Sequence, residues 1–244
     1  MKKIILIFPI LFCLQTLAEE SLFTKGNKEY TNGNYSTAII LYDSIISGGL
    51  QSSELFYNLG NCYYKTQDWA NAIWHYEKSL KLNTNNKEAS SNLELTKLRV
   101  IDQIETIPVL FYKKWWNNLI HLFSTKTWQI LTLLCIWIVL ITQLLNKYTN
   151  HKKKYLLRFL KTLTLILICT TFSSYQENYS KTEAIIFSPS VIVNSAPTDN
   201  KTNLFSLHSG TKVEIIDQIG NWIKIKLTNG NIGWIKESDC KILD

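Results

Sequence analysis

Three residues within one short stretch of the chain have side chains that could perform covalent chemistry. The sequence GNCYYKTQDWANAIWHY, residues 60–76, contains a thiol at Cys62, a carboxylate at Asp68 and an imidazole at His75. Catalysis requires that a nucleophile and a base be brought together. The other histidines add nothing to such a site, because they fall in three further segments of the chain: His121, His151 and His208.

No other sequence pattern is typical of an active site or a metal site. The chain has no glycine-rich phosphate loop, no paired carboxylates and no histidine–cysteine spacing suited to a metal. Of the five cysteines, only Cys62 and Cys240 lie in the parts expected to be soluble, one in each, so no disulfide framework is expected. We therefore predict a protein that is not an enzyme and that needs no metal or cofactor.

The formal net charge of +7 is concentrated in two short basic segments. Residues 1–18 contain Lys2 and Lys3 without an acid, residues 146–161 contain six lysines and arginines without an acid, and the rest of the chain is close to neutral. Each basic segment borders an apolar run, which is typical of membrane insertion. Because a nucleic-acid-binding domain would spread its basic residues over a folded face, we predict no nucleic acid partner.

Residues 1–18 have the organisation of a secretory signal peptide. A basic start is followed by an apolar run from Ile4 to Leu14 and by small residues before the expected cleavage site after Ala18. Whether the segment is cleaved or retained as an anchor stays open. A lipoprotein site at Cys13 is the less favoured alternative, because the preceding Phe12 is too large for that processing.

Two later apolar runs are long enough to cross a membrane. Residues 127–145 carry no charge, and residues 156–175 carry Arg158 and Lys161 near their start, where long side chains can reach the headgroups. The basic loop between them, residues 146–155, is expected in the cytoplasm. We predict a transmembrane hairpin in the inner membrane, with the parts on either side of it in the periplasm.

The segment that precedes the first span, residues 107–126, is rich in aromatic side chains, including Trp115 and Trp116. Tryptophan and tyrosine are enriched at membrane–water interfaces. We therefore expect an amphipathic helix that lies on the periplasmic leaflet. A helix that binds a partner protein is the alternative.

The N-terminal part of the chain matches itself at an offset of 34 residues. The sequence GNKEYTNGNYSTAIILY, from Gly26, aligns with the stretch that begins at Gly60, so glycine, tyrosine and alanine positions recur. A period of 34 with apolar positions at helical spacing resembles the tetratricopeptide (TPR) repeat, a helix–turn–helix unit. We predict repeats at about residues 19–52 and 53–86, followed by a capping helix over residues 87–106.

The resemblance to TPR proteins implies a concave groove lined by the first helix of each repeat. Asparagine and tyrosine side chains in such a groove suit the gripping of an extended peptide, although the tyrosines could instead pack between helices. Leu95 of the capping helix belongs to the same surface. The protein-binding residues carried over position by position are Asn27, Tyr30, Glu54, Tyr57, Asn61, Tyr64, Lys65 and Arg99.

The C-terminal segment, residues 176–244, consists of short runs that alternate apolar and polar residues, as strands do. The pairs Gly220–Asn221 and Asn229–Gly230 separate the last strong runs and are typical of hairpin turns. Five or six such strands predict a small β-barrel. The phrases GNW and GNIGWI resemble a bacterial SH3-like (SH3b) domain, a fold that can bind peptidoglycan or peptides.

The predicted fold class is multidomain α + β, with a TPR solenoid, a two-helix transmembrane hairpin and a small SH3-like β-barrel. This order of modules, with the segments FTKGNKEYTNGNYSTAI, WWNNL and GTKVEIIDQIGNWIKIKL, resembles the BatE family, the TPR and SH3-domain membrane proteins of Bacteroides aerotolerance (Bat) operons. The resemblance implies protein partners, namely Bat-type von Willebrand A-domain membrane proteins and a MoxR-type ATPase system. It also implies a role in envelope stress or aerotolerance.

Two hypotheses of function follow from this organisation. In the first, the protein is a non-catalytic adaptor whose TPR groove holds a partner and whose hairpin fixes the assembly in the membrane. In the second, it binds or senses the cell wall through its SH3-like domain. In neither hypothesis does the stretch that contains Cys62 and His75 act as a reaction centre.

Overall fold

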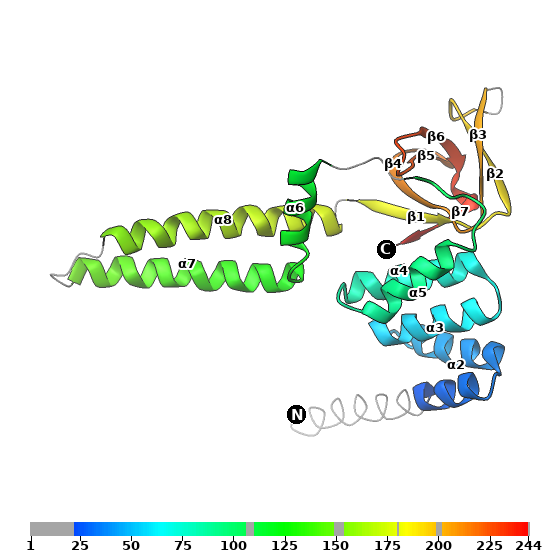
Figure 1. Ribbon diagram of the computed structural model, residues 1–244, viewed down its shortest axis with the longest axis horizontal. Coiled ribbons are helices and arrows are strands. Elements are labelled where there is room, and N and C mark those ends of the chain that lie inside the picture. Colours follow the sequence, from blue (N-terminus) through cyan, green and yellow to red (C-terminus); the bar gives the residue numbers. More distant parts are fainter. Residues whose placement is uncertain (1–21, 106–109, 149–153, 180, 199–201, 244) are drawn as a thin grey trace, which may run out of the picture. The chain divides into compact units, whose positions relative to one another are not determined.

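The computed structural model describes residues 22–105, 110–148, 154–179, 181–198 and 202–243 (Figure 1). The predicted signal peptide, residues 1–18, lies outside the described residues. The chain divides into two compact units. The first unit contains the helices before residue 106 and the sheet after residue 183, and the second contains the helices between them.

Five helices form the N-terminal part of the first unit. Three of them begin at a polar side chain that accepts a hydrogen bond from a backbone N–H of the first turn: Ser52 from Leu55, Asp68 from Asn71, and Asn86 from Ala89. The helices follow one another in the antiparallel pairs expected of stacked repeats. They are a first helix over residues 22–31, α2 (Tyr35–Ser47), α3 (Ser53–Lys65), α4 (Trp69–Leu82) and α5 (Lys87–Lys97).

The capping helix expected over residues 87–106 is shorter than the sequence predicted, because α5 ends at Lys97. The following residues, 98–105, contain the β-branched residues Val100, Ile101 and Ile104, which favour helix less than straight-chain residues do. Ile104 packs against the core of the C-terminal sheet, and Val100 packs against the cluster shared by the helices and the sheet. These tertiary contacts replace the last turns of the predicted helix.

Each helix pair is closed by a glycine on the first helix and a tyrosine on the second. A Cβ atom added to Gly26 would lie 2.5 Å from the ring of Tyr42, and one added to Gly60 would lie 2.6 Å from the ring of Tyr76. Both rings are buried. The two glycines therefore permit a backbone-to-ring contact that recurs at the 34-residue period.

We expect the substitution Gly60→Ala to lower the free energy of unfolding of the first unit by about 1–3 kcal/mol, because the added methyl overpacks a buried ring. The measurement is urea unfolding of the detergent-solubilised chain, followed by near-ultraviolet circular dichroism. Gly48→Ala is the control, since Gly48 is exposed and has an ordinary helical φ of −72°. Equal losses in the two variants would contradict the proposed contact.

The C-terminal part of the first unit is a seven-stranded sheet with the strand order β3-β2-β6-β5-β4-β1-β7. Both predicted hairpin turns are confirmed. Gly220 and Asn221 connect β4 to β5, and Asn229 and Gly230 lie between β5 and β6. The sequence did not predict β3. The strands are β1 (Thr182–Ile186), β2 (Ser190–Asn194), β3 (Asn203–His208), β4 (Lys212–Ile219), β5 (Trp222–Lys226), β6 (Ile232–Lys236) and β7 (Cys240–Leu243).

The prediction of a β-barrel was wrong, because the sheet is not closed. The strands β3 and β7 lie at opposite ends of the strand order, and each is an edge. Backbone groups on an open edge need partners. Residues that precede the sheet in the same unit provide some of them, at β7 and at the end of β3.

The edge strand β7 is covered by side chains of α4. The indole Nε1 of Trp74 donates to the carbonyl oxygen of Ile242 at 3.1 Å, and the ammonium of Lys81 donates to the carbonyl oxygen of Leu243. Lys241 lies with its Nζ atom 3.6 Å from the centre of the Trp74 ring, a cation–π contact. Leu243 itself is buried in the helical core, as is Ile185 of β1.

The segment 98–105 is tied to the end of the other edge strand, β3, through Asp102. The Asp102 carboxylate accepts hydrogen bonds from the backbone N–H of His208 at 2.6 Å, from His208 Nδ1 at 2.8 Å and from the hydroxyl of Thr211 at 2.6 Å. Nearby, Lys212 forms ion pairs with Glu77 of α4 at 2.9 Å and with Glu183 of β1 at 2.8 Å. The helices and the sheet are thus joined by polar contacts as well as by a shared core.

We expect Asp102→Asn to destabilise the first unit by about 1–3 kcal/mol, because an amide nitrogen would face hydrogen-bond donors. Burial alone would raise the pKa of Asp102, but hydrogen bonds from Thr211 and His208 outweigh it and hold the pKa below its ordinary value. The wild-type contribution is therefore fully present above the unfolded-state pKa of about 3.9 and is lost as the pH falls further.

The measurement is thermal unfolding of the full chain between pH 2 and pH 7, and Asp102→Asn should reduce the fall in melting temperature below about pH 4. Glu105→Gln is the matched control, because Glu105 is an exposed acid in the same segment. An unchanged melting temperature in Asp102→Asn would show that this carboxylate does not join the helices to the sheet.

The second unit is a helical hairpin preceded by a short helix: α6 (Phe111–Ile120), α7 (Thr125–Tyr148) and α8 (Lys154–Tyr179). The helices α7 and α8 include the predicted spans, residues 127–145 and 156–175, and extend beyond them. Both are long and apolar enough to cross a membrane. Part of the predicted basic loop, residues 149–153, lies outside the described residues.

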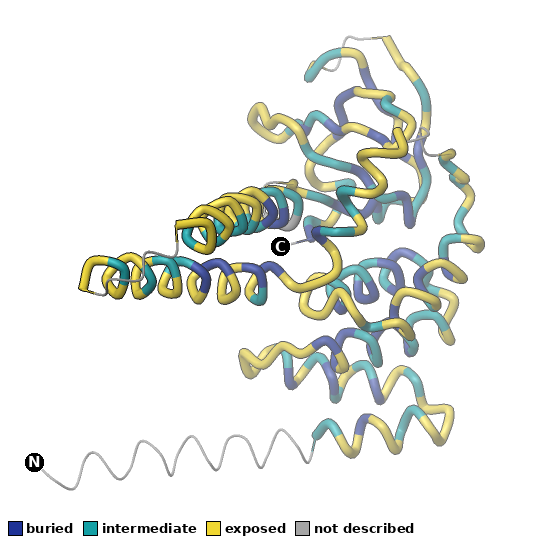
Figure 2. Tube along the Cα trace, turned by 60° about the vertical axis from the view of Figure 1, so that its left-hand side comes forward, coloured by how far each residue is buried: buried dark blue, intermediate teal, exposed yellow. Residues whose placement is uncertain are grey.

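Polar side chains meet between the two long helices. The hydroxyls of Thr125 and Ser174 lie 2.9 Å apart, and those of Thr132 and Thr171 lie 2.8 Å apart. In an apolar surrounding such groups need partners, and hydrogen bonds between helices supply them. Thr125, Thr132 and Ser174 are buried, whereas many large apolar residues of both helices are exposed, and Figure 2 shows the hairpin exposed along much of its length.

Candidate functional site

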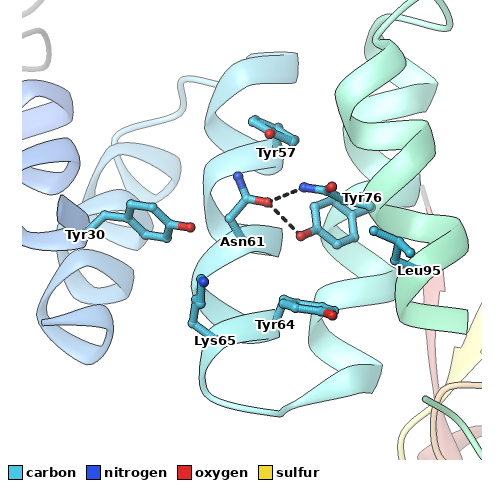
Figure 3. Close-up of a pocket in the computed structure, with 8 residues that line it drawn as sticks. Tyr30, Tyr57, Asn61, Tyr64, Lys65, Tyr76 and Leu95 are labelled. Atoms are coloured by element: carbon cyan, nitrogen blue, oxygen red, sulfur yellow. Dashed lines mark hydrogen bonds between the residues drawn. The ribbon is translucent and has the colours of Figure 1, made fainter. Parts of the chain in front are cut away.

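A pocket of about 260 Å³ lies among the helices of the first unit (Figure 3). The first helix, α3, α4 and α5 each contribute side chains to it, and α3 contributes most. Four tyrosine rings and one leucine make the walls largely aromatic and apolar. The lining residues are Tyr30, Tyr57, Asn61, Tyr64, Lys65, Tyr76, Asn92 and Leu95.

The structure brings five of the eight predicted groove residues to this pocket: Tyr30, Tyr57, Asn61, Tyr64 and Lys65. Leu95, which the sequence placed on the same surface, also lines it. That these residues bind a partner stays a prediction.

The other three predicted groove residues do not line this pocket. Asn27 bonds to neighbouring helices, Glu54 is exposed in the first turn of α3, and Arg99 is exposed beyond the end of α5. Glu54 and Arg99 were carried over by position along the repeat. Glu54 lies in the first turn of α3, and Arg99 follows the end of α5.

The amide oxygen of Asn61 is used inside the protein. It accepts a hydrogen bond from the hydroxyl of Tyr76 at 2.7 Å and from the amide of Asn92 at 2.8 Å, as Figure 3 shows. This oxygen is thus already used in hydrogen bonds that join α3 to α4 and α5. Its amide nitrogen makes no hydrogen bond to another described residue and remains a donor for a ligand.

The first repeat contains the same arrangement at the 34-residue offset. The amide oxygen of Asn27 accepts from the hydroxyl of Tyr42 at 2.6 Å and from the amide of Asn58 at 3.0 Å. The two amide oxygens therefore each join three helices, and the amide nitrogens are left as the groups that could donate to a partner. That Asn27 and Asn61 grip a peptide stays a prediction.

Sequence reasoning did not assign Tyr76 and Asn92 to the groove. The 34-residue offset does align Asn92 with Asn58. The structure adds that the two asparagines make equivalent contacts, with Asn61 and Asn27 respectively.

The groove tyrosines pack against neighbouring aromatic rings, which was the alternative to gripping a peptide. Tyr30 packs edge-to-face against Tyr35 with 5.4 Å between ring centres, and Tyr64 packs in the same way against Trp69 at 5.4 Å. Each tyrosine also lines the pocket. Burial raises the pKa of Tyr30, so its hydroxyl remains protonated and can donate a hydrogen bond.

Lys65 is exposed and is the one charged residue among those lining the pocket. Together with the tyrosine hydroxyls and the Asn61 amide, its ammonium makes the pocket rich in hydrogen-bond donors. Among the described residues, no group of three or more His, Cys, Asp or Glu side chains is placed to hold a metal ion. The pocket is therefore suited to a ligand that offers acceptors and an apolar side chain.

The three residues with potential for covalent chemistry have structural roles. Burial raises the pKa of the Cys62 thiol to about 12 and lowers the pKa of His75 to about 4. The Nδ1 atom of His75 lies 2.7 Å from the carbonyl oxygen of Asn71, and Asp68 caps α4. A protonated thiol and a neutral, enclosed imidazole are the opposite of an activated nucleophile and its base.

Two family models match parts of the chain. The tetratricopeptide repeat matches residues 53–86, and the bacterial SH3 domain matches residues 189–240. No curated protein matches the chain. The chain thus contains a TPR repeat and a bacterial SH3 domain, as the two resemblances predicted, and no family of enzymes is indicated. TPR repeats suggest protein–protein interaction, and bacterial SH3 domains suggest binding to the cell wall.

Proposed function

We propose that this protein is a non-catalytic membrane adaptor that holds an extended segment of a partner protein in the pocket between its TPR helices. The observation that carries the proposal is the convergence of Tyr30, Tyr64 and Lys65, from two repeats, on one pocket. The long helices α7 and α8 would fix the assembly in the membrane.

The size of the pocket favours a protein segment over a small molecule. A volume of about 260 Å³ is below the roughly 300–1,000 Å³ of typical small-molecule sites. It suits one anchoring side chain of a longer segment. The tyrosine rings provide apolar contact area for that side chain, and the hydroxyl, amide and ammonium donors can reach backbone carbonyls beside it.

The cellular setting proposed here follows the sequence resemblance and the basic loop. The positive-inside rule favours a hairpin in the inner membrane with the TPR and SH3 domains in the periplasm. The resemblance to the BatE family supports partners of the Bat type, namely von Willebrand A-domain membrane proteins and a MoxR-type ATPase system. The process served would then be envelope stress or aerotolerance.

The proposal is tested by photo-crosslinking in native membranes. With p-benzoylphenylalanine in place of Leu95, an exposed residue at the pocket, we expect a discrete protein adduct. The substitutions Tyr64→Ala and Lys65→Glu should reduce its yield. The control position is Ser36, which is exposed on α2 and does not line the pocket. No protein adduct at position 95, or equal adducts at positions 95 and 36, would refute the proposed groove.

A second candidate function is binding to the cell wall, which the bacterial SH3 match at residues 189–240 favours. If it is correct, the detergent-solubilised full chain will co-sediment with purified peptidoglycan sacculi. Sedimentation should be unaffected by Lys65→Glu, since that residue lies in the helical part of the chain. Failure to sediment with sacculi would remove this candidate and leave the adaptor proposal standing.

A further inference from the structure

The helix α6 has one apolar half and one polar half along its whole length. At about 100° per residue, six apolar or aromatic side chains fall on one half of the helix and four polar side chains fall on the other. The polar set is Lys113, Lys114, Asn117 and Asn118, and the apolar set is Phe111, Tyr112, Trp115, Trp116, Leu119 and Ile120.

The hairpin covers only one edge of the apolar half. Ile120 is 2% exposed, and its carbonyl oxygen accepts a hydrogen bond from the indole of Trp128 at 2.9 Å. At the other edge, Phe111 is 85% exposed and Trp115 is 66% exposed. Large aromatic side chains in such positions mark an interaction surface.

The orientation of α6 relative to the hairpin distinguishes it from a third span. Figure 1 shows α6 crossing the hairpin at a steep angle, at the end where α7 begins and α8 finishes. The helices α6 and α8 are in contact there, and His121 lies 4.0 Å from the carboxylate of Glu177. If α7 and α8 cross a bilayer, α6 lies along its surface.

We propose that the exposed aromatic surface of α6, formed by Phe111, Tyr112 and Trp115, binds the lipid interface of the leaflet at this end of the hairpin. The proposal rests on the membrane insertion of α7 and α8, and it is independent of the proposed groove. The surface would then be a second attachment of the chain to the membrane, beside the hairpin.

Two observations favour lipid over a protein partner. The adjoining hairpin also exposes large apolar side chains along its length, and both its helices are long and apolar enough to lie in lipid. The aromatic surface contains tryptophan and tyrosine, which prefer the headgroup level of a membrane. Lys113 and Lys114 lie on the opposite half of α6, where they can remain in water or contact lipid phosphates.

The experiment uses the full chain in nanodiscs of phosphatidylethanolamine and phosphatidylglycerol that contain an alkyne-bearing acyl chain. The photo-reactive residue p-benzoylphenylalanine replaces Phe111 or Trp115 in separate variants, and replacement at Tyr112 provides a third site if either variant fails to fold. Asn118, exposed on the polar half of α6, is the matched negative position. Leu133, exposed on α7, reports insertion of the hairpin.

We expect lipid adducts at positions 111, 115 and 133 and background labelling at position 118. Strong labelling at position 133 would show that the hairpin is inserted. If positions 111 and 115 then showed only background labelling, the proposal for α6 would be overturned. Protein adducts in place of lipid adducts at positions 111 and 115, from membranes that retain other proteins, would assign the surface to a protein partner and also overturn it. An unlabelled position 133 would remove the membrane hairpin and this proposal with it.

Discussion

The contact between α4 and the edge of the C-terminal sheet is the constraint on which the first unit depends. One side of α4 carries Ala72 and Tyr76 into the core of the repeat, and the same helix accepts Ile185 and Leu243 from the sheet. Its polar side chains, Trp74 and Lys81, bind the backbone of β7. A single helix thus supports both the pocket and the open edge of the sheet.

This contact explains how so few repeats can form a stable stack. Solenoids bury their cores by stacking, and about three repeats are usually needed, with a polar cap at each end. Here two helix pairs and α5 are followed by the sheet, whose buried Ile185 and Leu243 occupy the surface that another helix would cover. The C-terminal sheet therefore covers the end of the TPR stack. In return, α4 side chains bind two backbone carbonyl groups of the edge strand β7.

The parts of the structure that the sequence predicted are those with local or periodic signals. The 34-residue offset indicated Gly26, Gly60 and the helix pairs, and long apolar runs indicated α7 and α8. The end of α5 and the open sheet could not be predicted in this way. Both depend on contacts between residues far apart in the chain, such as Asp102 with His208 and Trp74 with Ile242.

The candidate site shows the same division. The repeat alignment placed Tyr64 and Lys65 correctly at the pocket, because their helix position follows from the period. It did not show that the oxygen of Asn61 is committed to Tyr76 and Asn92, since that depends on the packing of three helices. Position along a repeat therefore brought five of the eight predicted residues to the pocket, and only the structure showed which of their atoms are already used in packing.

The order of the modules has a consequence for folding. The TPR helices are complete by residue 97, but the strands that cover α4 come from residues 182–186 and 240–243. Between them the chain inserts α6, α7 and α8, so contacts such as Trp74 with Ile242 span 168 residues. Contacts between residues so distant in sequence form slowly, because a long loop must close first. Insertion of α7 and α8 as a hairpin would return the chain to the side of the membrane that it left, which shortens the search of the C-terminal strands for α4.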